Sequence, residues 1–304
     1  MGQTTPSLGA RCLAEVVGTF ILVFFGCGAV HAAVLANAQS GLWQVAIVWG
    51  VAVMVAIYVV GGISGAHINP AITITLAAWG RVSRGLVLPY IVSQLVGAFL
   101  AASVLFALYD PHMRALENEK QVVRGQAGSE ITAMCYGEYF PSPNEGKNLD
   151  AYKRDDGEQL ARRVPPGAAF LAEVLGTLLL ALVVFALTDE RNTGAPPPYL
   201  APVFIGLTVS ILISVIAPLT QACFNPARDF GPRLFAFFAG WGRIALPGPN
   251  GIHVFTVYAA APITGALLGG GLYQLVLRPQ FVPPITPQIR GTIPDDLPER
   301  TEAE

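Results

Sequence analysis

Two copies of the tripeptide Asn-Pro-Ala have the composition and spacing to act on a passing solute. They lie at Asn69-Pro70-Ala71 and Asn225-Pro226-Ala227, each at the start of a short apolar helical pattern. Asn is a preferred helix cap and Pro fits the first helical position, so each copy predicts a helix start. A helix N-terminus carries the equivalent of about half a positive charge. Two such ends facing each other, with the side-chain amides of Asn69 and Asn225 pointing into a lumen, would attract a solute oxygen and repel a cation.

Arg228 follows the second tripeptide directly, in the first turn of its helix. The helix dipole disfavours a cation there by about 0.3–1 kcal/mol. The 36 residues from Asn192 to Ala227 contain no charged residue, so Arg228 is an isolated cation at the edge of an apolar region. An arginine inside a membrane is costly and indicates function by default. The structural alternative is an ion pair with Asp229.

The segments around these residues predict a membrane protein. The mean hydropathy is +0.54, only 12% of the residues are charged, and 53% are hydrophobic. A helix needs roughly 20 apolar residues to cross a hydrocarbon core of about 30 Å. The net charge of −2 gives no indication of a nucleic-acid partner. We predict six spans, at about Cys12–Leu35, Gln44–Gly62, Leu86–Tyr109, Ala168–Leu187, Leu200–Ala217 and His253–Leu277.

The chain also repeats itself. Leu13–Thr19 recurs as Leu171–Thr177 with six identities in seven positions, and the offset is nearly that between the two Asn-Pro-Ala sites. Each half therefore holds three spans and one short helix. Because three is odd, the second half must enter the membrane from the opposite face. Such an inverted repeat places its binding site near the midplane, where broken helices meet.

The short helices are too short to cross a membrane. Asn69–Gly80 would measure about 18 Å at 1.5 Å per residue. Irregular segments precede both helices, at residues 61–68 and 218–224. Irregular backbone at membrane depth is tolerated only where it lines a wet cavity or is buried in protein. The prediction is an all-α membrane protein with six transmembrane helices and two re-entrant half-helices.

The domain organisation follows from composition. We expect an N-terminal tail at residues 1–10, a channel domain at 11–278 and a Pro-rich, disordered tail at 279–304. Within the domain, repeat 1 covers 11–109, an extramembrane loop 110–165 and repeat 2 166–278. Residues 110–163 hold eight of the 18 Lys and Arg. Four scattered cysteines are too few for a disulfide framework or a zinc site, and no metal or cofactor is predicted.

Two motifs carry a family resemblance. Ser64–Ala71, read Ser-Gly-Ala-His-Ile-Asn-Pro-Ala, and Asn225–Arg233, read Asn-Pro-Ala-Arg-Asp-Phe-Gly-Pro-Arg, resemble the major intrinsic proteins, the aquaporin family. Asp229, Arg233 and the Pro262-Ile263 pair resemble the glycerol facilitators, or aquaglyceroporins, within it. The resemblance implies a homotetramer with one pore per subunit, which passes glycerol, water and other small neutral solutes across the lipid bilayer and excludes ions and protons.

The resemblance also implies roles for individual residues. Arg228 would form the constriction with Trp49, Ile213 and Ala222, where facilitators typically place Gly at the position of Ile213 and Phe at that of Ala222. This ring is more similar to that of plant nodulin-type channels. Glu15, Glu173 and Asp229 would support the loops. Backbone carbonyls would form a ladder of acceptors along the pore, from Gly65, Ala66 and His67 in the first half and Gln221, Ala222 and Cys223 in the second.

Several alternatives compete with a glycerol channel. A water-selective pore usually pairs Phe and His in its ring, and Trp49 and Ala222 argue against it. A channel for urea or metalloid acids would use the same fold. A coupled secondary transporter would use Glu15 and Glu173 as a proton relay, yet no further charged chain runs through the spans. An enzyme is the least favoured class, because no nucleophile–base pair or metal-ligand spacing appears.

The location follows from the same resemblance. It implies a multi-pass protein of the plasma or inner cell membrane, with both termini in the cytoplasm and the loop at 110–165 outside. Eight basic residues in that loop oppose the positive-inside expectation on simple counting. That rule weakens for loops near about 60 residues, so the implied orientation stands as the prediction.

Overall fold

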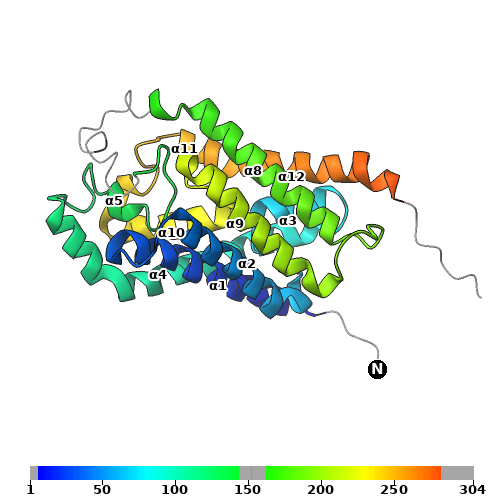
Figure 1. Ribbon diagram of the computed structural model, residues 1–304. Helices are drawn as coiled ribbons and strands as arrows, with labels where there is room; N and C mark the ends of the chain where they lie inside the picture. Colours follow the sequence, from blue (N-terminus) through cyan, green and yellow to red (C-terminus); the bar gives the residue numbers. More distant parts are fainter. Residues whose placement is uncertain (1–5, 144–151, 153–161, 282–304) are drawn as a thin grey trace, which may run out of the picture.

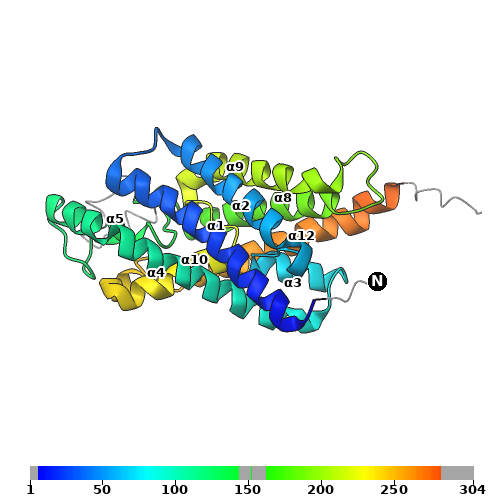
Figure 2. The same ribbon diagram turned by 90° about the horizontal axis from the view of Figure 1, so that it is seen from below.

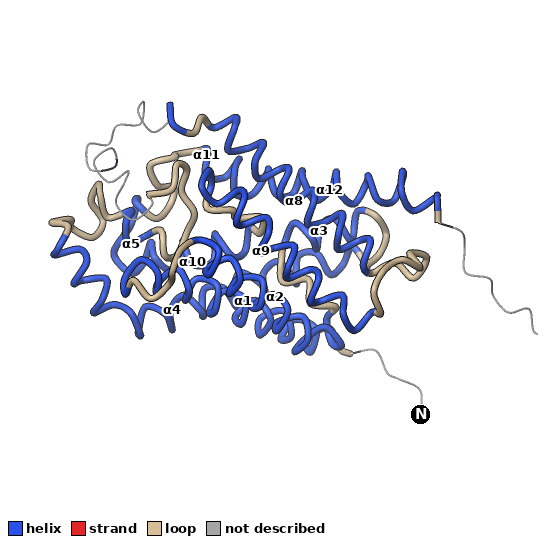
Figure 3. The backbone as a smooth tube through the Cα atoms, viewed as in Figure 1, coloured by secondary structure: helices blue, strands red, loops and turns tan. Residues whose placement is uncertain are grey.

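The computed structural model describes residues 6–143, 152 and 162–281, and these parts of the chain contain helices and loops but no strand (Figure 3). Six helical segments are long and apolar enough to cross a membrane. The all-α architecture predicted from the sequence is confirmed. The six segments are α1 (Leu8–Ala36), α2 (Leu42–Ser64), α4 (Val87–Glu119), α8 (Pro166–Leu187), α9 (Ala201–Thr220) and His253–Gln280, which includes α11 (His253–Phe255) and α12 (Ala261–Leu272). The shorter helices are α3 (Pro70–Ala78), α5 (Glu130–Ala133) and α10 (Pro226–Ala236).

The two halves pack in the same way. In the first half α1 lies against α2 and α4, in the second α8 lies against α9 and α12, and α2 and α9 join the halves. The half-helix α3 packs against α12 and α4, and α10 packs against α4 (Figures 1 and 2). The start of α1 and the end of the last helix lie at one end of the bundle, which we call the termini end, and α5 lies at the other, the connector end (Figure 1).

Glycines allow the closest helix contacts, and they do so at matched places. A Cβ atom on Gly97 in α4 would lie 2.2 Å from the carbonyl oxygen of Val16 in α1. A Cβ atom on Gly265 in α12 would lie 2.2 Å from the carbonyl oxygen of Val174 in α8. Small residues let membrane helices approach at backbone distance, so the repeat in the sequence reappears as a repeat in packing.

The half-helix α3 is shorter than the predicted Asn69–Gly80. It ends at Ala78, because Gly80 adopts the left-handed conformation with φ of 71°. The Gly80 N–H then donates to the Ala77 carbonyl at 3.2 Å and the Arg81 N–H to the Leu76 carbonyl at 2.8 Å. This pair of bonds is the Schellman arrangement that ends many helices.

Two long helices extend past their predicted ends. Helix α1 begins at Leu8, inside the predicted N-terminal tail, and α4 continues to Glu119 instead of ending at Tyr109. The charges that predicted a loop there are paired with one another. Asp110 binds Arg114 at 2.7 Å and Arg124 at 2.8 Å, and Arg124 also binds Glu117 at 3.0 Å. Charged side chains that satisfy each other at this end leave the helix free to continue.

The connector at 110–165 is only partly a polar loop. Its segment from 131 to 141 folds back into the bundle, and Tyr136, Tyr139 and Phe140 are buried there at 1%, 1% and 3% exposure. Residues 144–151 and 153–161 lie outside the described structure, as do 282–304, where the sequence predicts a disordered tail. The described segment matters because it reaches the site below.

Candidate functional site

The two Asn-Pro-Ala sites meet at the centre of the bundle. Asn69 caps α3 through a hydrogen bond from the Ala71 N–H at 2.8 Å, and Asn225 caps α10 through one from the Ala227 N–H at 3.0 Å. The side-chain amide of each Asn also crosses to the other half. Asn69 Nδ2 donates to the Phe224 carbonyl at 2.9 Å, and Asn225 Nδ2 donates to the Ile68 carbonyl at 2.8 Å.

These cross-links leave each amide with one further N–H. The sequence predicts that the Asn side chains point into the lumen; the structure also uses one of the two N–H groups of each Asn69 and Asn225 amide to hold the opposite loop. Both residues line the central cavity described below. The pair therefore joins the two halves and still presents a donor to that cavity.

Glu15 holds the loop before α3 from inside the protein. Its carboxylate accepts hydrogen bonds from the backbone N–H groups of His67 and Ile68, at 2.9 and 2.7 Å. It also accepts from the Ser64 hydroxyl at 2.7 Å and the Gln94 amide at 2.8 Å. Glu15 is fully buried and out of reach of solvent, so these protein donors take the place of the water that would otherwise hydrogen-bond to its carboxylate.

Glu173 does the same for the loop before α10. It accepts from the backbone N–H groups of Cys223 and Phe224 at 3.0 and 2.9 Å, and from the Thr220 hydroxyl at 2.6 Å. It too is fully buried. Among the described residues nothing takes the place of Gln94, because the matching position in α12 is Pro262, which has no amide to donate.

The loops held in this way have an unusual backbone. Non-glycine residues with positive φ occur before α3 at Ala66 and Ile68, and before α10 at Gln221, Ala222 and Phe224. Each such residue costs of order 1–3 kcal/mol and persists only where its surroundings impose the conformation. The buried carboxylates supply that constraint. Among the predicted carbonyl residues, Gly65, Ala66, His67, Ala222 and Cys223 line the central cavity, whereas Gln221 lines a second one.

Arg228 faces an aromatic ring on one side and an acid on the other. Its guanidinium carbon lies 4.1 Å from the centre of the Trp49 ring, and Nη1 forms an ion pair with Glu138. Arg228 does not pair with Asp229. That carboxylate binds the Nε atom of Arg233 at 2.7 Å and accepts the Glu138 backbone N–H at 2.6 Å. The sequence had left a pair between Arg228 and Asp229 open.

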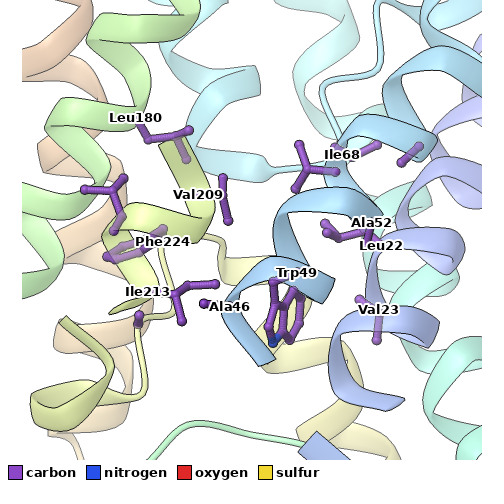
Figure 4. Close-up of a cluster of buried hydrophobic side chains, with 14 of the residues drawn as sticks. Leu22, Val23, Ala46, Trp49, Ala52, Ile68, Leu180, Val209, Ile213 and Phe224 are labelled. Atoms are coloured by element: carbon purple, nitrogen blue, oxygen red, sulfur yellow. The ribbon is translucent and has the colours of Figure 1, made fainter. Parts of the chain in front are cut away.

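Two cavities share wall residues beside this arginine. The central cavity, of about 500 Å³, includes Trp49, Ile213, Ala222 and Arg228 in its wall. A second cavity, of about 340 Å³, lies toward the connector end, and Trp49 and Ile213 line it as well. All four residues predicted for the ring thus line the central cavity, and two of them also line the second. Figure 4 shows Trp49 on α2 and Ile213 on α9 within the buried cluster around them.

Sequence reasoning missed two charged residues in these walls. Glu138 lines the second cavity, and Arg81 lines the central cavity near the termini end. Glu138 lies in a connector rich in charges, and its only distinguishing signal was the run of Tyr136, Tyr139 and Phe140 around it, which is typical of a buried segment. Arg81 had a clearer signal, since it directly follows the uncharged stretch from Val16 to Gly80.

Comparison with known proteins gives consistent similarities. The family model described as major intrinsic protein matches residues 3–273. The chain is 42% identical over 274 residues to the glycerol uptake facilitator protein of Pseudomonas aeruginosa, covering 90% of each chain. It is 38% identical over 277 residues to that of Escherichia coli K12, covering 91% of each, and 39% identical over 271 residues to the propanediol uptake facilitator of Citrobacter freundii, covering 89% of this chain and 93% of the relative.

A solved structure supports the fold. The X-ray structure of the aquaglyceroporin from Plasmodium falciparum superposes with a TM-score of 0.73 over 90% of this chain and 98% of that one. The sequence identity is 24%, so this likeness concerns the arrangement of the helices.

Proposed function

The chain belongs to the major intrinsic protein family, and from that premise we propose that it is a passive channel for glycerol and other small neutral solutes, together with water. The observation that carries this function is the pair of cavities that share Trp49 and Ile213 in their walls, with Arg228 stacked on Trp49 in the central one. A solute crossing there meets an aromatic face and a cationic hydrogen-bond donor at once. A polyol has C–H groups for the first and hydroxyl oxygens for the second. The chain is a multi-pass membrane protein with six spans.

We propose that the ring of Trp49, Ile213, Ala222 and Arg228 selects the solute. Ile213 stands where a facilitator is expected to have Gly, and Ala222 where it is expected to have Phe, yet the ring keeps one broad apolar face and one donor. This combination favours linear polyols and vicinal diols over water alone. The relatives named for glycerol and for propanediol support the same solute class.

The proposed exclusion of ions rests on the centre of the pore. The N-termini of α3 and α10 meet where Asn69 and Asn225 exchange hydrogen bonds, so two positive helix ends face a cation. The same two amides would break a chain of hydrogen-bonded water, because each donates to the oxygen of a water molecule at this point. Carbonyls of Gly65, Ala66, His67, Ala222 and Cys223 would accept from the solute on the way through.

A coupled transporter is not favoured by the structure of the two carboxylates. Glu15 and Glu173 are fully buried and bound to loop backbone N–H groups. A proton relay needs a carboxylate that alternates between two sides, whereas these two hold their loops in place. We also propose that the chain performs no chemistry on its solute, in keeping with relatives named as facilitators.

Location and assembly belong to the same proposal. We propose that the protein resides in the plasma or inner cell membrane with its termini in the cytoplasm, so that the termini end of the bundle is the cytoplasmic side. We further propose a homotetramer with a pore in each subunit. The long helices present exposed apolar side chains suited to lipid or to neighbouring subunits, among them Leu13, Leu108, Leu171, Ile211 and Val215.

Stopped-flow light scattering on proteoliposomes tests the function. The wild type should pass glycerol and 1,2-propanediol far faster than empty liposomes and should also pass water. Arg228→Ala should still pass glycerol but lose discrimination between glycerol and larger polyols. Fast water flux without glycerol flux would contradict the proposal and indicate that Ile213 narrows the ring to a water-selective pore.

A further inference from the structure

Arg81 lies at the other end of the central cavity from Arg228. Both side chains line that one cavity, Arg228 where it meets the second cavity and Arg81 beside Val82, Thr188 and Pro198 near the termini end. Arg81 is fixed by the end of α3, because its own N–H closes the final turn onto the Leu76 carbonyl at 2.8 Å. The C-terminal end of the short helix α3 therefore holds Arg81 at the cavity wall.

The surroundings of Arg81 resemble those of Arg228. The Arg81 guanidinium carbon lies 4.4 Å from the centre of the Phe185 ring, as that of Arg228 lies 4.1 Å from Trp49. Arg81 also has a carboxylate beside it, Asp189, at 3.4 Å. Its side chain is only 17% exposed, and Nη1 donates to the Thr188 hydroxyl at 3.0 Å. A guanidinium held between a ring and an acid is thus found at both ends of the cavity.

The acid beside Arg81 does not cancel its charge. Asp189 Oδ2 is shared with Arg278, whose Nε lies at 2.7 Å, closer than Arg81 at 3.4 Å. Two guanidinium groups and one carboxylate leave one net positive charge. Asp189 is absent from the cavity lining, whereas Arg81 is part of it. A cation in this mouth of the cavity therefore meets Arg81 first.

We infer that Arg81 is a second cation barrier, placed at the termini mouth of the pore and acting in series with Arg228. The inference rests on the proposed function, since it assigns a role within that channel. A positive charge on the wall of a narrow, low-dielectric passage raises the energy of a cation there and leaves a neutral polyol unaffected. Arg81 thus contributes to selectivity by charge, while the ring around Arg228 also selects by shape.

The test is sodium leak into proteoliposomes that contain a sodium-sensitive dye, with glycerol flux measured on the same vesicles. All variants are made in an Arg228→Ala protein, because the barrier at Arg228 would otherwise hide the effect of removing the one at Arg81. Adding Arg81→Ala should raise the sodium leak about tenfold over Arg228→Ala alone. Arg81→Lys should retain low leak, because it keeps the charge. Arg84→Ala is the matched control, since Arg84 is three residues away, exposed and absent from the cavity lining, and it should leave the leak unchanged.

A further variant separates charge from structure. Asp189→Asn in the Arg228→Ala background removes the contact of Arg81 with its acid but keeps the cation, so the leak should stay equal or fall. If Asp189→Asn raised the leak as much as Arg81→Ala, Arg81 would act only by holding the fold together, and the inference would be wrong. The inference would also be wrong if Arg81→Ala and Arg84→Ala, each combined with Arg228→Ala, gave the same sodium leak, or if neither gave any. Wild-type vesicles without glycerol flux would instead contradict the proposed function.

Discussion

Two rings of side chains in the central cavity occupy matched places in the two halves of the chain. Trp49, Ile213, Ala222 and Arg228 form one. At the offset that separates the two Asn-Pro-Ala sites lie their counterparts, and all of these line the same cavity: Ile205, Ile57, Ala66 and Ile72. The first ring has an aromatic face and a cation, and the second is apolar throughout. Matched backbone positions thus hold an aromatic ring and a cation in the first ring and only apolar side chains in the second.

The parts that hold the backbone do not differ in this way. Both loops are bound by a buried glutamate through two backbone N–H groups and one hydroxyl. Both helix crossings use a glycine against a carbonyl of the partner helix. The repeat therefore preserves the supports of the two half-helices, while the aromatic face and the cation of the Trp49 ring have no counterpart at the matched positions. Changes to supports should therefore act alike in both halves, and changes to ring residues should not.

The largest effect should come from the two glutamates. Glu15→Gln and Glu173→Gln place amide N–H groups against backbone donors, and each donor left without an acceptor costs about 1–3 kcal/mol. Both variants should unfold at much lower temperature than wild type in detergent, as measured by circular dichroism. Glu15→Gln should be the worse of the two, because Glu15 binds four donors and Glu173 three. Glu190→Gln, at an exposed position, is the control. If only one of the two buried-glutamate variants had a lower melting temperature, the two supports would not be equivalent.

Next in size are the glycines at the crossings. Gly97→Ala and Gly265→Ala each push a methyl group to 2.2 Å from a carbonyl oxygen, so the helices must separate. Overpacking of this kind costs typically 1–3 kcal/mol, and we expect equal losses of thermal stability in the two variants. Gly62→Ala is the matched control, since a Cβ atom there meets nothing within 4 Å. Unequal losses of stability in the Gly97 and Gly265 variants would show that the two helix crossings do not contribute equally to the stability of the fold.

The ring positions should respond unequally. Trp49→Ile makes the selecting ring resemble its apolar counterpart and removes the cation–π contact with Arg228, which contributes about 0.5–2 kcal/mol. The ratio of glycerol to water permeability should fall roughly threefold to tenfold. Ile205→Val, at the matched place in the other ring, should leave that ratio within a factor of about two. Stopped-flow light scattering measures both ratios, and similar changes in the two variants would mean that the rings share selection.

Much of the scaffold could be predicted from the sequence, because it rests on local signals. The Asn-Pro-Ala caps, the uncharged stretches and the Leu13–Thr19 repeat predict the half-helices, the six spans and the inverted arrangement. The bounds were less predictable. The extension of α4 to Glu119 depends on Arg124, which neutralises Asp110 and Glu117 from the following turn. From the sequence alone, charged residues that pair with one another in the folded helix cannot be told from those of a solvated loop.

The contacts of the site that could not be predicted all join distant segments. Glu138 and Arg228 are 90 residues apart, and no local pattern ties the connector to α10. The Asn69 amide bonds to Phe224, 155 residues away. Arg233 also shapes this region, because its Nη2 donates to the Glu138 carbonyl while its Nε binds Asp229. Such contacts depend on how loops fold back onto the bundle, which composition and periodicity do not encode.

The smallest predicted effect lies at the termini end and depends on pH. Burial raises the pKa of the Asp189 carboxyl, but hydrogen bonds from the Arg191 N–H and the Arg278 guanidinium outweigh it and hold the pKa below its ordinary value. A lowered pKa stabilises the fold above the unfolded value of about 3.9 and loses that contribution as the pH falls below it. Asp189→Asn should therefore lower the melting temperature by a few degrees at pH 7 and narrow the gap to wild type below about pH 4. A constant gap from pH 7 to pH 3 would contradict this account.

The exchange of radiolabelled glycerol into proteoliposomes, with and without imposed proton and sodium gradients, tests whether the protein is a passive channel. If the cavities around Arg228 form one passive pathway, the initial rate should rise linearly with glycerol concentration and be the same under every gradient. Flux that appears only with a gradient would contradict a channel and would make Glu15 and Glu173 candidates for a proton relay.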